Sequence, residues 1–293
     1  PFRTSMKKIC SIPVLILAAV CAMTIWQGCK TPSPAEKQAV ATPDGCSAPV
    51  VSSKQYFIQE HLVQSALWFQ HSAEYRALAH QAFNLGRFHL DDIMKRSRFS
   101  KPPCVVVDID ETVLNNSPYT GFQVRCGQPF NMADWMSWTE KAEAEPIPGA
   151  LEYLKWAKER GAETFYISNR SVAELDATIK NLKMHGFPYV DKAHVLLRDT
   201  VSTKKYRRAK VEETNTIVLL FGDNLGDLHE MFEGLNTAER NRKVEDNAKE
   251  FGPRYIVMPN PMYGGWEKAM RDGAKLNTAQ KDSLRHAKLK SFR

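Results

Sequence analysis

The chain has 293 residues, of which 43% are hydrophobic and 25% are charged, and its formal net charge is +7. This composition excludes a disordered, collagen-like or multi-span membrane protein. A chain of this length can bury a core, as one large domain or two small ones, without disulfides or a structural metal.

The first 28 residues predict a signal peptide of the lipoprotein type. A basic start at Met6-Lys7-Lys8 precedes a largely apolar run over 9–25, and small residues follow that run. This order is typical of an export signal. A short transmembrane anchor is the alternative. However, Pro13 interrupts the run, which is at the lower limit of the ~17–25 residues that a membrane span needs.

Cys29 is the expected site of lipid attachment. Gly28-Cys29 resembles the lipobox of bacterial lipoproteins, although Trp26 and Gln27 depart from it. We expect an exported protein of the bacterial cell envelope, anchored in the outer membrane if Cys29 is acylated and periplasmic otherwise. Cleavage removes three basic residues and no acidic one, which lowers the net charge from +7 to +4. No dense basic stripe remains, so a nucleic-acid polymer is not an expected partner.

The remaining chain divides into a tether, a folded domain and a tail. Residues 29–53 are rich in Pro, Ser, Ala and Lys, a composition typical of a flexible tether. Residues 274–293 form a basic C-terminal tail or solvated helix. Cys46, Cys104 and Cys126 are left after cleavage and lipidation, an odd number without paired spacing, so neither a disulfide framework nor a zinc site is expected. Cys104 begins an apolar strand and reads as a small buried residue.

Residues 54–98 carry apolar side chains at helical spacing, and short apolar strands then alternate with helices. One helix is expected over 149–160, and another begins after Ser171, with a capping box to Glu174, and ends before Gly186. The predicted strands are 104–109, 164–168, 194–197, 217–221 and 254–257. Runs that are apolar on both faces favour a parallel sheet covered on both sides. The predicted fold is therefore a doubly wound, Rossmann-like α/β domain preceded by helices.

Polar side chains follow the predicted strands at their carboxyl ends, where ligands bind in such sheets. Asp108-Ile109-Asp110-Glu111-Thr112 follows the first strand, Ser168 ends the second, Lys204 precedes the fourth, and Gly222-Asp223-Asn224-Leu225-Gly226-Asp227 follows the fourth. A helix cap at Asp108 or a turn at Asp223 would explain either motif alone. Their occurrence at successive strand ends favours one shared site.

These residue types suit phosphoryl chemistry. Two aspartates at spacing i, i+2 lie on one side of a strand end, so one can attack while the other transfers protons. Carboxylate and carbonyl oxygens without His or Cys suit a hard cation, Mg²⁺ best, and four clustered carboxylates would repel one another without it. A lysine and a serine hydroxyl can bind phosphoryl oxygens.

The pattern resembles the haloacid-dehalogenase superfamily of phosphatases and phosphotransferases, and more closely the class C non-specific acid phosphatases, which are bacterial lipoprotein acid phosphatases. The segments 106–119 and 222–227 are similar to the two signatures that supply that family's four aspartates. The segments 72–75, 81–85 and 259–264 are also similar. The resemblance covers roughly 54–271. It implies a haloacid-dehalogenase-type phosphatase domain over 54–273, whose N-terminal helices form a small α-helical cap, with a cap insert at about 115–147.

The resemblance implies a magnesium-dependent phosphomonoesterase acting on 5′-nucleotides and related mononucleotides. Asp108 attacks phosphorus to form an aspartyl-phosphate, and Asp110 protonates the leaving group and then activates water. Ser168 and Lys204 bind the phosphoryl group, with Lys205 as the alternative lysine. Mg²⁺ is held by the Asp108 carboxylate, the Asp110 carbonyl and Asp223, with Asp227 as a ligand or a support. Thr112 fixes the loop, and Asn169 and Arg170 are structural or rim residues.

Trp135, Tyr119 and Tyr263 are the expected substrate-binding aromatics, because a ring near a phosphate site can stack on a base. Trp138 and Phe122 are equally well explained as packing. A non-catalytic surface lipoprotein that binds nucleotides or cofactors is the alternative function, and an interaction protein with a phosphatase scaffold is another. Similar proteins are dimeric, so a homodimer is the assembly that the resemblance implies.

Overall fold

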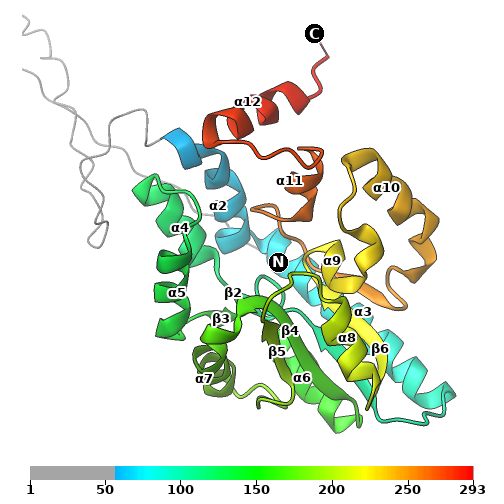
Figure 1. The fold of residues 1–293 in the computed structure, drawn as a ribbon. Coiled ribbons are helices and arrows are strands. Elements are labelled where there is room, and N and C mark those ends of the chain that lie inside the picture. The colour runs from blue at the N-terminus through cyan, green and yellow to red at the C-terminus, as the bar shows by residue number, and fades with distance from the viewer. Residues whose placement is uncertain (1–56, 293) are drawn as a thin grey trace, which may run out of the picture. The chain divides into compact units, whose positions relative to one another are not determined.

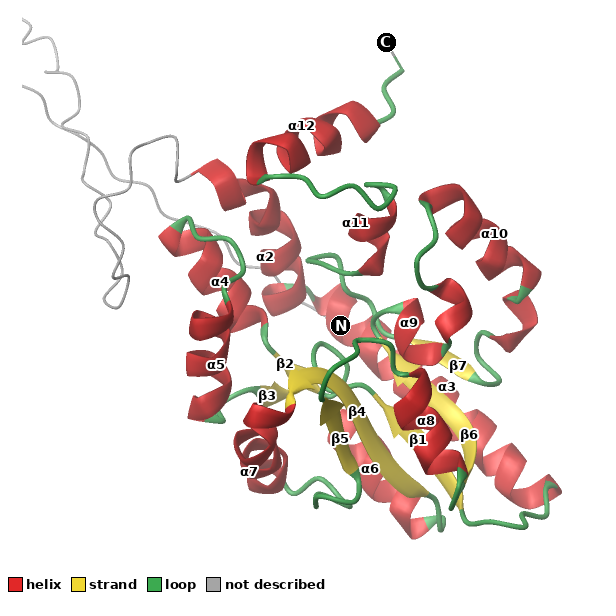
Figure 2. Ribbon diagram, in the orientation of Figure 1, coloured by secondary structure: helices red, strands yellow, loops and turns green. Residues whose placement is uncertain are grey.

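The fold of this protein is known from a computed structural model that describes residues 57–292. The predicted signal peptide, the tether and Cys29 lie outside the described residues. Five strands form a parallel sheet in the order β5-β4-β1-β6-β7 (Figure 2). They are β1 (Pro103–Val107), β4 (Glu163–Ser171), β5 (Val195–Arg198), β6 (Thr216–Gly222) and β7 (Tyr255–Val257). A small antiparallel pair joins β2 (Leu114–Asn115) to β3 (Glu145–Pro146). The predicted doubly wound α/β fold is confirmed.

The sheet is buried on both faces because the strand residues alternate between two cores. In β1, Val105 and Val107 belong to one apolar cluster, whereas Cys104 and Val106 belong to the other. The first cluster is covered by α3 (Ala73–Arg96) and α6 (Ala150–Glu159), and the second by α8 (Lys205–Glu212), as Figure 1 shows. Helix α3 lies very close to β6, because a Cβ on Gly86 would be 2.4 Å from the Phe221 ring.

The predicted helical region over 54–98 is helical but divided. It contains η1 (Phe57–Leu62), α2 (Val63–His71) and α3. Ser72 separates α2 from α3 with an extended backbone, and its side chain accepts a hydrogen bond from the Tyr75 amide at 3.0 Å. This N-cap explains the break, because a serine hydroxyl satisfies an amide that the first turn leaves unpaired.

The strand crossovers carry the other helices, whose bounds are α4 (Ser117–Cys126), α5 (Met132–Lys141), η2 (Val172–Glu174), α7 (Leu175–His185), α9 (Leu225–Leu228), η3 (Glu230–Phe232), α10 (Thr237–Asp246), η4 (Ala248–Glu250), α11 (Gly265–Ala269) and α12 (Thr278–Lys288). The predicted capping box of Ser171 and Glu174 is present, and it begins η2, which leads into α7. Strand β4 continues to Ser171, beyond its predicted end at Ser168. Within residues 57–292, no helix combines the length and apolar character that crossing a membrane requires.

The cysteines differ from the sequence-based expectation at one position. Cys126 is disulfide-bonded, although the cysteine spacing indicated no disulfide framework. Spacing along the chain does not show which cysteines meet in the fold, which is why the expectation failed. In the basic C-terminal segment, helix α12 is tied to α11 by an ion pair of 2.7 Å between Arg285 and Glu267. Cys104 is a free, buried cysteine, as expected.

Candidate active site

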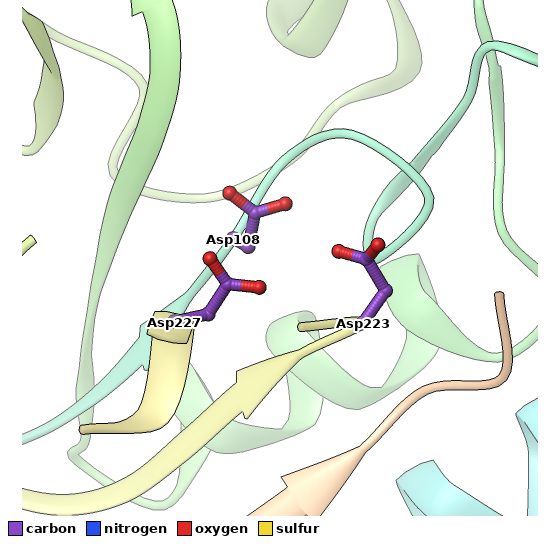
Figure 3. A group of neighbouring side chains, drawn as sticks. All are labelled: Asp108, Asp223 and Asp227. Atoms are coloured by element: carbon purple, nitrogen blue, oxygen red, sulfur yellow. The ribbon is translucent and has the colours of Figure 1, made fainter. Parts of the chain in front are cut away.

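Three aspartates converge at the carboxyl end of the sheet (Figure 3). Asp108 follows β1, and its amide donates to the carbonyl of Phe221 at 2.9 Å, which continues the pairing of β1 with β6. Asp223 follows β6, and Asp227 lies in α9. One carboxylate oxygen of each of Asp108, Asp223 and Asp227 lies within 4.8 Å of the others. The strand ends therefore bring together the two motifs that the sequence analysis singled out.

Local backbone geometry explains how Asp227 reaches this cluster. The Asp227 carboxylate accepts a hydrogen bond from the Asn224 amide at 2.9 Å, as part of a capping box at the start of α9. A Cβ on Gly222 would lie 2.4 Å from the Asp227 Cβ. Only glycine permits this close approach at the end of β6.

The cluster is strongly acidic and desolvated. Burial, together with the charges of Asp227 and Asp110, raises the pKa of Asp108 to about 7, although Lys204 opposes the shift. Burial and the charges of Asp227 and Asp108 hold the pKa of Asp223 well above its usual range. Crowded, buried carboxylates of this kind are stabilised by a hard divalent cation, and an all-oxygen donor set fits Mg²⁺. The residues present therefore fit the divalent metal that this chemistry implies.

Lys204 is the cation nearest to these carboxylates. It lies directly before α8, is 2% exposed, and its Nζ contacts the Asp108 carboxylate and lies 2.7 Å from Asp227 Oδ1. Lys205, the alternative lysine, has a side chain that is 56% exposed and lies 3.6 Å from Glu230. Of the two neighbouring lysines, only Lys204 is placed to neutralise charge at Asp108.

Asp110 lies beside this cluster and is held by three side chains. Its Oδ2 accepts from the Ser168 hydroxyl at 3.0 Å. Its Oδ1 accepts from Asn116 Nδ2 at 2.8 Å and from Arg170 Nε at 2.9 Å. In this structure the Ser168 hydroxyl is thus engaged with Asp110. Of the two roles expected for Arg170, structural or rim, the structure agrees with the first, because Arg170 is 3% exposed and forms an ion pair with Asp110.

Helix α8 carries two further arginines that the sequence analysis missed. Arg207 donates to the carbonyl of Ser168 and to Asn169 Oδ1, the latter at 2.7 Å. Arg208 donates to the carbonyl of Asp227 at 2.9 Å. Both lie three or four residues after Lys204, so one helical turn ties the loops around the site together. That spacing after Lys204 was the available signal.

The loop after β6 is supported from the other side as well. Asn260 Nδ2 donates to Asp223 Oδ2 at 2.8 Å, and the Thr112 hydroxyl lies 3.5 Å from Asp223 Oδ1. Glu111 adopts a positive φ of 57°, and its Oε1 accepts from the Asn116 amide at 2.7 Å. The turn after β1 is therefore locked to the residues that surround the aspartates.

A cavity of about 1140 Å³ opens onto the aspartates. Its lining includes Asp108, Asp110, Lys204, Asp223, Asp227 and the three aromatics Tyr119, Trp135 and Tyr263 that the sequence analysis named. The ring centroids of Tyr119 and Trp135 are 5.2 Å apart in an edge-to-face arrangement. Tyr119 is largely buried and its hydroxyl donates to the Asn131 carbonyl at 3.1 Å, whereas Tyr263 is 39% exposed. Trp138 packs against the core and donates to Asn116 Oδ1 at 2.8 Å.

A buried parallel sheet with carboxylates and a lysine at its strand ends defines a protein of the haloacid-dehalogenase (HAD) type. A family model described as HAD superfamily, subfamily IIIB (acid phosphatase), matches residues 46–266. The chain therefore belongs to this acid phosphatase family.

Known proteins support the same assignment. The chain is similar to the class C acid phosphatase from Bacillus anthracis, for which one of two solved structures has tungstate bound. The identity is 42%, the TM-score is 0.77, and the match covers 81% of this chain and 100% of that one. It is 28% identical to acid phosphatase 1 of Solanum lycopersicum and 26% identical to the stem 31 kDa glycoprotein of Glycine max, each over 54% of this chain. The chain spans 57% and 58% of the length of these two relatives.

Proposed function

We propose that this protein is a Mg²⁺-dependent acid phosphatase that hydrolyses phosphomonoesters through an aspartyl-phosphate at Asp108. The observation that carries the proposal is the cluster of Asp108, Asp223 and Asp227 with the Lys204 ammonium among them. A buried carboxylate beside a lysine and a candidate cation site has what phosphoryl transfer needs, namely a nucleophile and compensation of the phosphoryl charge.

In the first step, an oxygen of Asp108 attacks phosphorus and the bond between phosphorus and the ester oxygen breaks. Asp110 gives its proton to the departing oxygen, which leaves as an alcohol. In the second step, Asp110 takes a proton from water, which attacks phosphorus and releases inorganic phosphate together with the free Asp108 carboxylate. Lys204 stabilises negative charge on the phosphoryl oxygens in both steps.

The metal would be held by carboxylates of Asp108, Asp223 and Asp227 and by the backbone carbonyl of Asp110. When bound, it supplies positive charge that offsets both the clustered carboxylates and the phosphoryl oxygens. Ser168 would donate to a phosphoryl oxygen once substrate is bound, since a hydroxyl can rotate away from Asp110.

The substrates that we propose are 5′-nucleotides and related mononucleotides. Trp135 and Tyr263 line the cavity with aromatic faces, and base–aromatic stacking contributes roughly 1–3 kcal/mol per base. The Tyr119 ring packs edge-to-face against that of Trp135. We also propose export to the cell envelope with a lipid anchor at Cys29, on the sequence alone, and a homodimer, on the family resemblance.

The test is phosphate release by the purified protein from 5′-mononucleotides and p-nitrophenyl phosphate at mildly acidic pH. Activity should disappear after treatment with EDTA and return with Mg²⁺. Acid quench during turnover of ³²P-labelled substrate should trap a protein-bound acyl phosphate that hydroxylamine releases. Nucleotide binding without turnover of any phosphomonoester would instead identify the alternative, a non-catalytic binding lipoprotein.

A further inference from the structure

We propose that Arg170 and Asn116 form a clamp that aims one oxygen of Asp110, Oδ2, at the leaving group. Arg170 is thus a positioning residue for proton transfer. This inference rests on the proposed function, in which Asp110 carries the proton. Arg170 and Asn116 determine which of the two Asp110 oxygens exchanges that proton, and in which direction this oxygen points.

Arg170 grips Asp110 with two nitrogens. Its Nε and Nη2 each lie 2.9 Å from Asp110 Oδ1. Its third nitrogen, Nη1, donates to the Thr178 hydroxyl of α7 at 3.1 Å. The guanidinium is buried and planar, so these contacts fix its orientation as well as its charge. Arg170 therefore connects Asp110 to a helix that packs on the sheet.

Asn116 supplies the second half of the clamp, and its amide orientation is determined by its neighbours. Its Oδ1 accepts from Trp138 Nε1 at 2.8 Å and from Arg170 Nη2 at 3.3 Å. With the oxygen facing two donors, Nδ2 must point to Asp110 Oδ1, which it reaches at 2.8 Å. Trp138 belongs to α5, so the insertion between β1 and α6 takes part in holding Asp110.

The two Asp110 oxygens are consequently unequal. Oδ1 is occupied by donors from Arg170 and Asn116, all of them unable to accept a proton. Within residues 57–292, the one side chain that hydrogen-bonds to Oδ2 is that of Ser168, whose hydroxyl lies at 3.0 Å. A hydroxyl can donate to a carboxylate or accept from a carboxylic acid, so this contact tolerates both protonation states of Asp110. Oδ2 is therefore the oxygen that gives its proton to the ester oxygen as the bond to phosphorus breaks.

If the Asp110 carboxyl group is wrongly oriented, the loss of activity depends on the leaving group. A general disturbance of the fold would instead slow all substrates alike. Alkoxide leaving groups need a proton as they depart, whereas 2,4-dinitrophenolate departs without one. General acid catalysis contributes about 10²–10⁴-fold where it is needed. Loss of the clamp should therefore slow alkyl phosphates far more than 2,4-dinitrophenyl phosphate.

The experiment compares kcat/KM for 2,4-dinitrophenyl phosphate and for a simple alkyl phosphate, with Mg²⁺, in the full protein. This ratio reports the first step, in which the ester bond breaks, and not the later hydrolysis of the aspartyl-phosphate, in which Asp110 acts as a base for both esters. For Arg170→Met we expect kcat/KM on the alkyl ester to fall about 100-fold and kcat/KM on the dinitrophenyl ester to stay within about threefold. Arg170→Lys keeps the charge but not the two-nitrogen grip, and should show the same selectivity in weaker form. Arg87→Met is the matched control, because Arg87 is a partly buried arginine stacked on Trp156 at 4.7 Å and lies outside the active-site lining.

Asp110→Asn separates this inference from the proposed function. If Asp110→Asn lowers kcat/KM equally for both esters, Asp110 does not protonate the leaving group, and the proposed mechanism falls together with the clamp. If Asp110→Asn lowers kcat/KM selectively for the alkyl ester but Arg170→Met and Arg170→Lys lower it equally for both esters, the clamp alone is overturned. Should Arg170→Met not fold, Arg170→Lys and Asn116→Ala decide the question by the same ratio of the two kcat/KM values.

Discussion

The floor and the wall of the cavity are built in opposite ways. The floor consists of charged groups beside the carboxyl ends of the strands, each with a charged or hydrogen-bonding partner. Asp108 and Lys204 are buried there, and Asp110 is half-buried. The wall consists of aromatic rings from the region of α4 and α5 and from the loop between β7 and α11. Examples are Phe130 and Tyr263, which are 57% and 39% exposed. The core of the fold thus supplies the charged groups of the cavity, while the region of α4 and α5 and the loop before α11 supply its aromatic rings.

The largest expected effect is on the floor, in Asp108→Asn. The amide keeps the shape of the side chain but is a far weaker nucleophile, so kcat should fall by about 10⁴-fold or more on every phosphomonoester. The measurement is steady-state hydrolysis of a nucleotide and of a small alkyl phosphate. A loss that depends strongly on the substrate would contradict the assignment of Asp108 to the chemistry common to all of them.

Lys204→Met tests the same region with a smaller expected effect. Removal of the ammonium leaves Asp108 and Asp227 without their cationic partner and removes one source of charge stabilisation, so kcat should fall about 10²–10³-fold. Lys205→Met is a control on the neighbouring residue, since the Lys205 side chain is mostly exposed. Equal losses in the two variants would remove the distinction between the two lysines.

The difference between floor and wall also explains what the sequence could predict. Apolar runs of period two mark buried strands, and parallel strands carry their functional residues at one edge. Asp108, Asp223 and Lys204 were therefore placed together from the sequence, as was the crossover helix over 149–160. The Ser171 capping box was also legible, because its spacing is local.

The residues that the sequence analysis missed or undervalued have no such periodic signal. Arg170 follows Ser168 by two residues, so the two side chains lie on one face of a strand only if β4 continues past Ser168, as it does. Arg207 reaches the Ser168 carbonyl because it lies one helical turn after Lys204. Its position around the helix therefore depends on the residue at which α8 begins. The contacts of such arginine side chains can be predicted only when the ends of the strands and helices are known to within one or two residues.

The wall is tested by Trp135→Ala. Loss of one stacking face should raise KM for a 5′-nucleotide about 10-fold, because stacking contributes roughly 1–3 kcal/mol, and should leave a small alkyl phosphate nearly unchanged. Phe88→Ala is the control, since Phe88 is an exposed aromatic on α3 outside the cavity lining. A KM increase of the same size for both substrates would show that Trp135 affects the charged groups of the floor and does not stack on the base.

The smallest expected effect is on thermal stability, namely a rise in Tm on adding Mg²⁺ that depends on pH. Because the pKa of Asp108 is raised to about 7 in the fold, from an ordinary value near 4, the metal-free fold binds a proton here more tightly than the unfolded chain does. The stability from this proton is complete below about pH 4 and is lost as the pH rises through about 7. A bound cation replaces the proton's charge, so the rise in Tm on adding Mg²⁺ to EDTA-treated protein should be larger at pH 8 than at pH 5, by about 2–4 °C. Asp223→Asn should shrink this difference, because it removes one carboxylate from the site. A Tm increase that is equal at the two pH values, or greater at pH 5, would show that Mg²⁺ does not bind to these buried carboxylates.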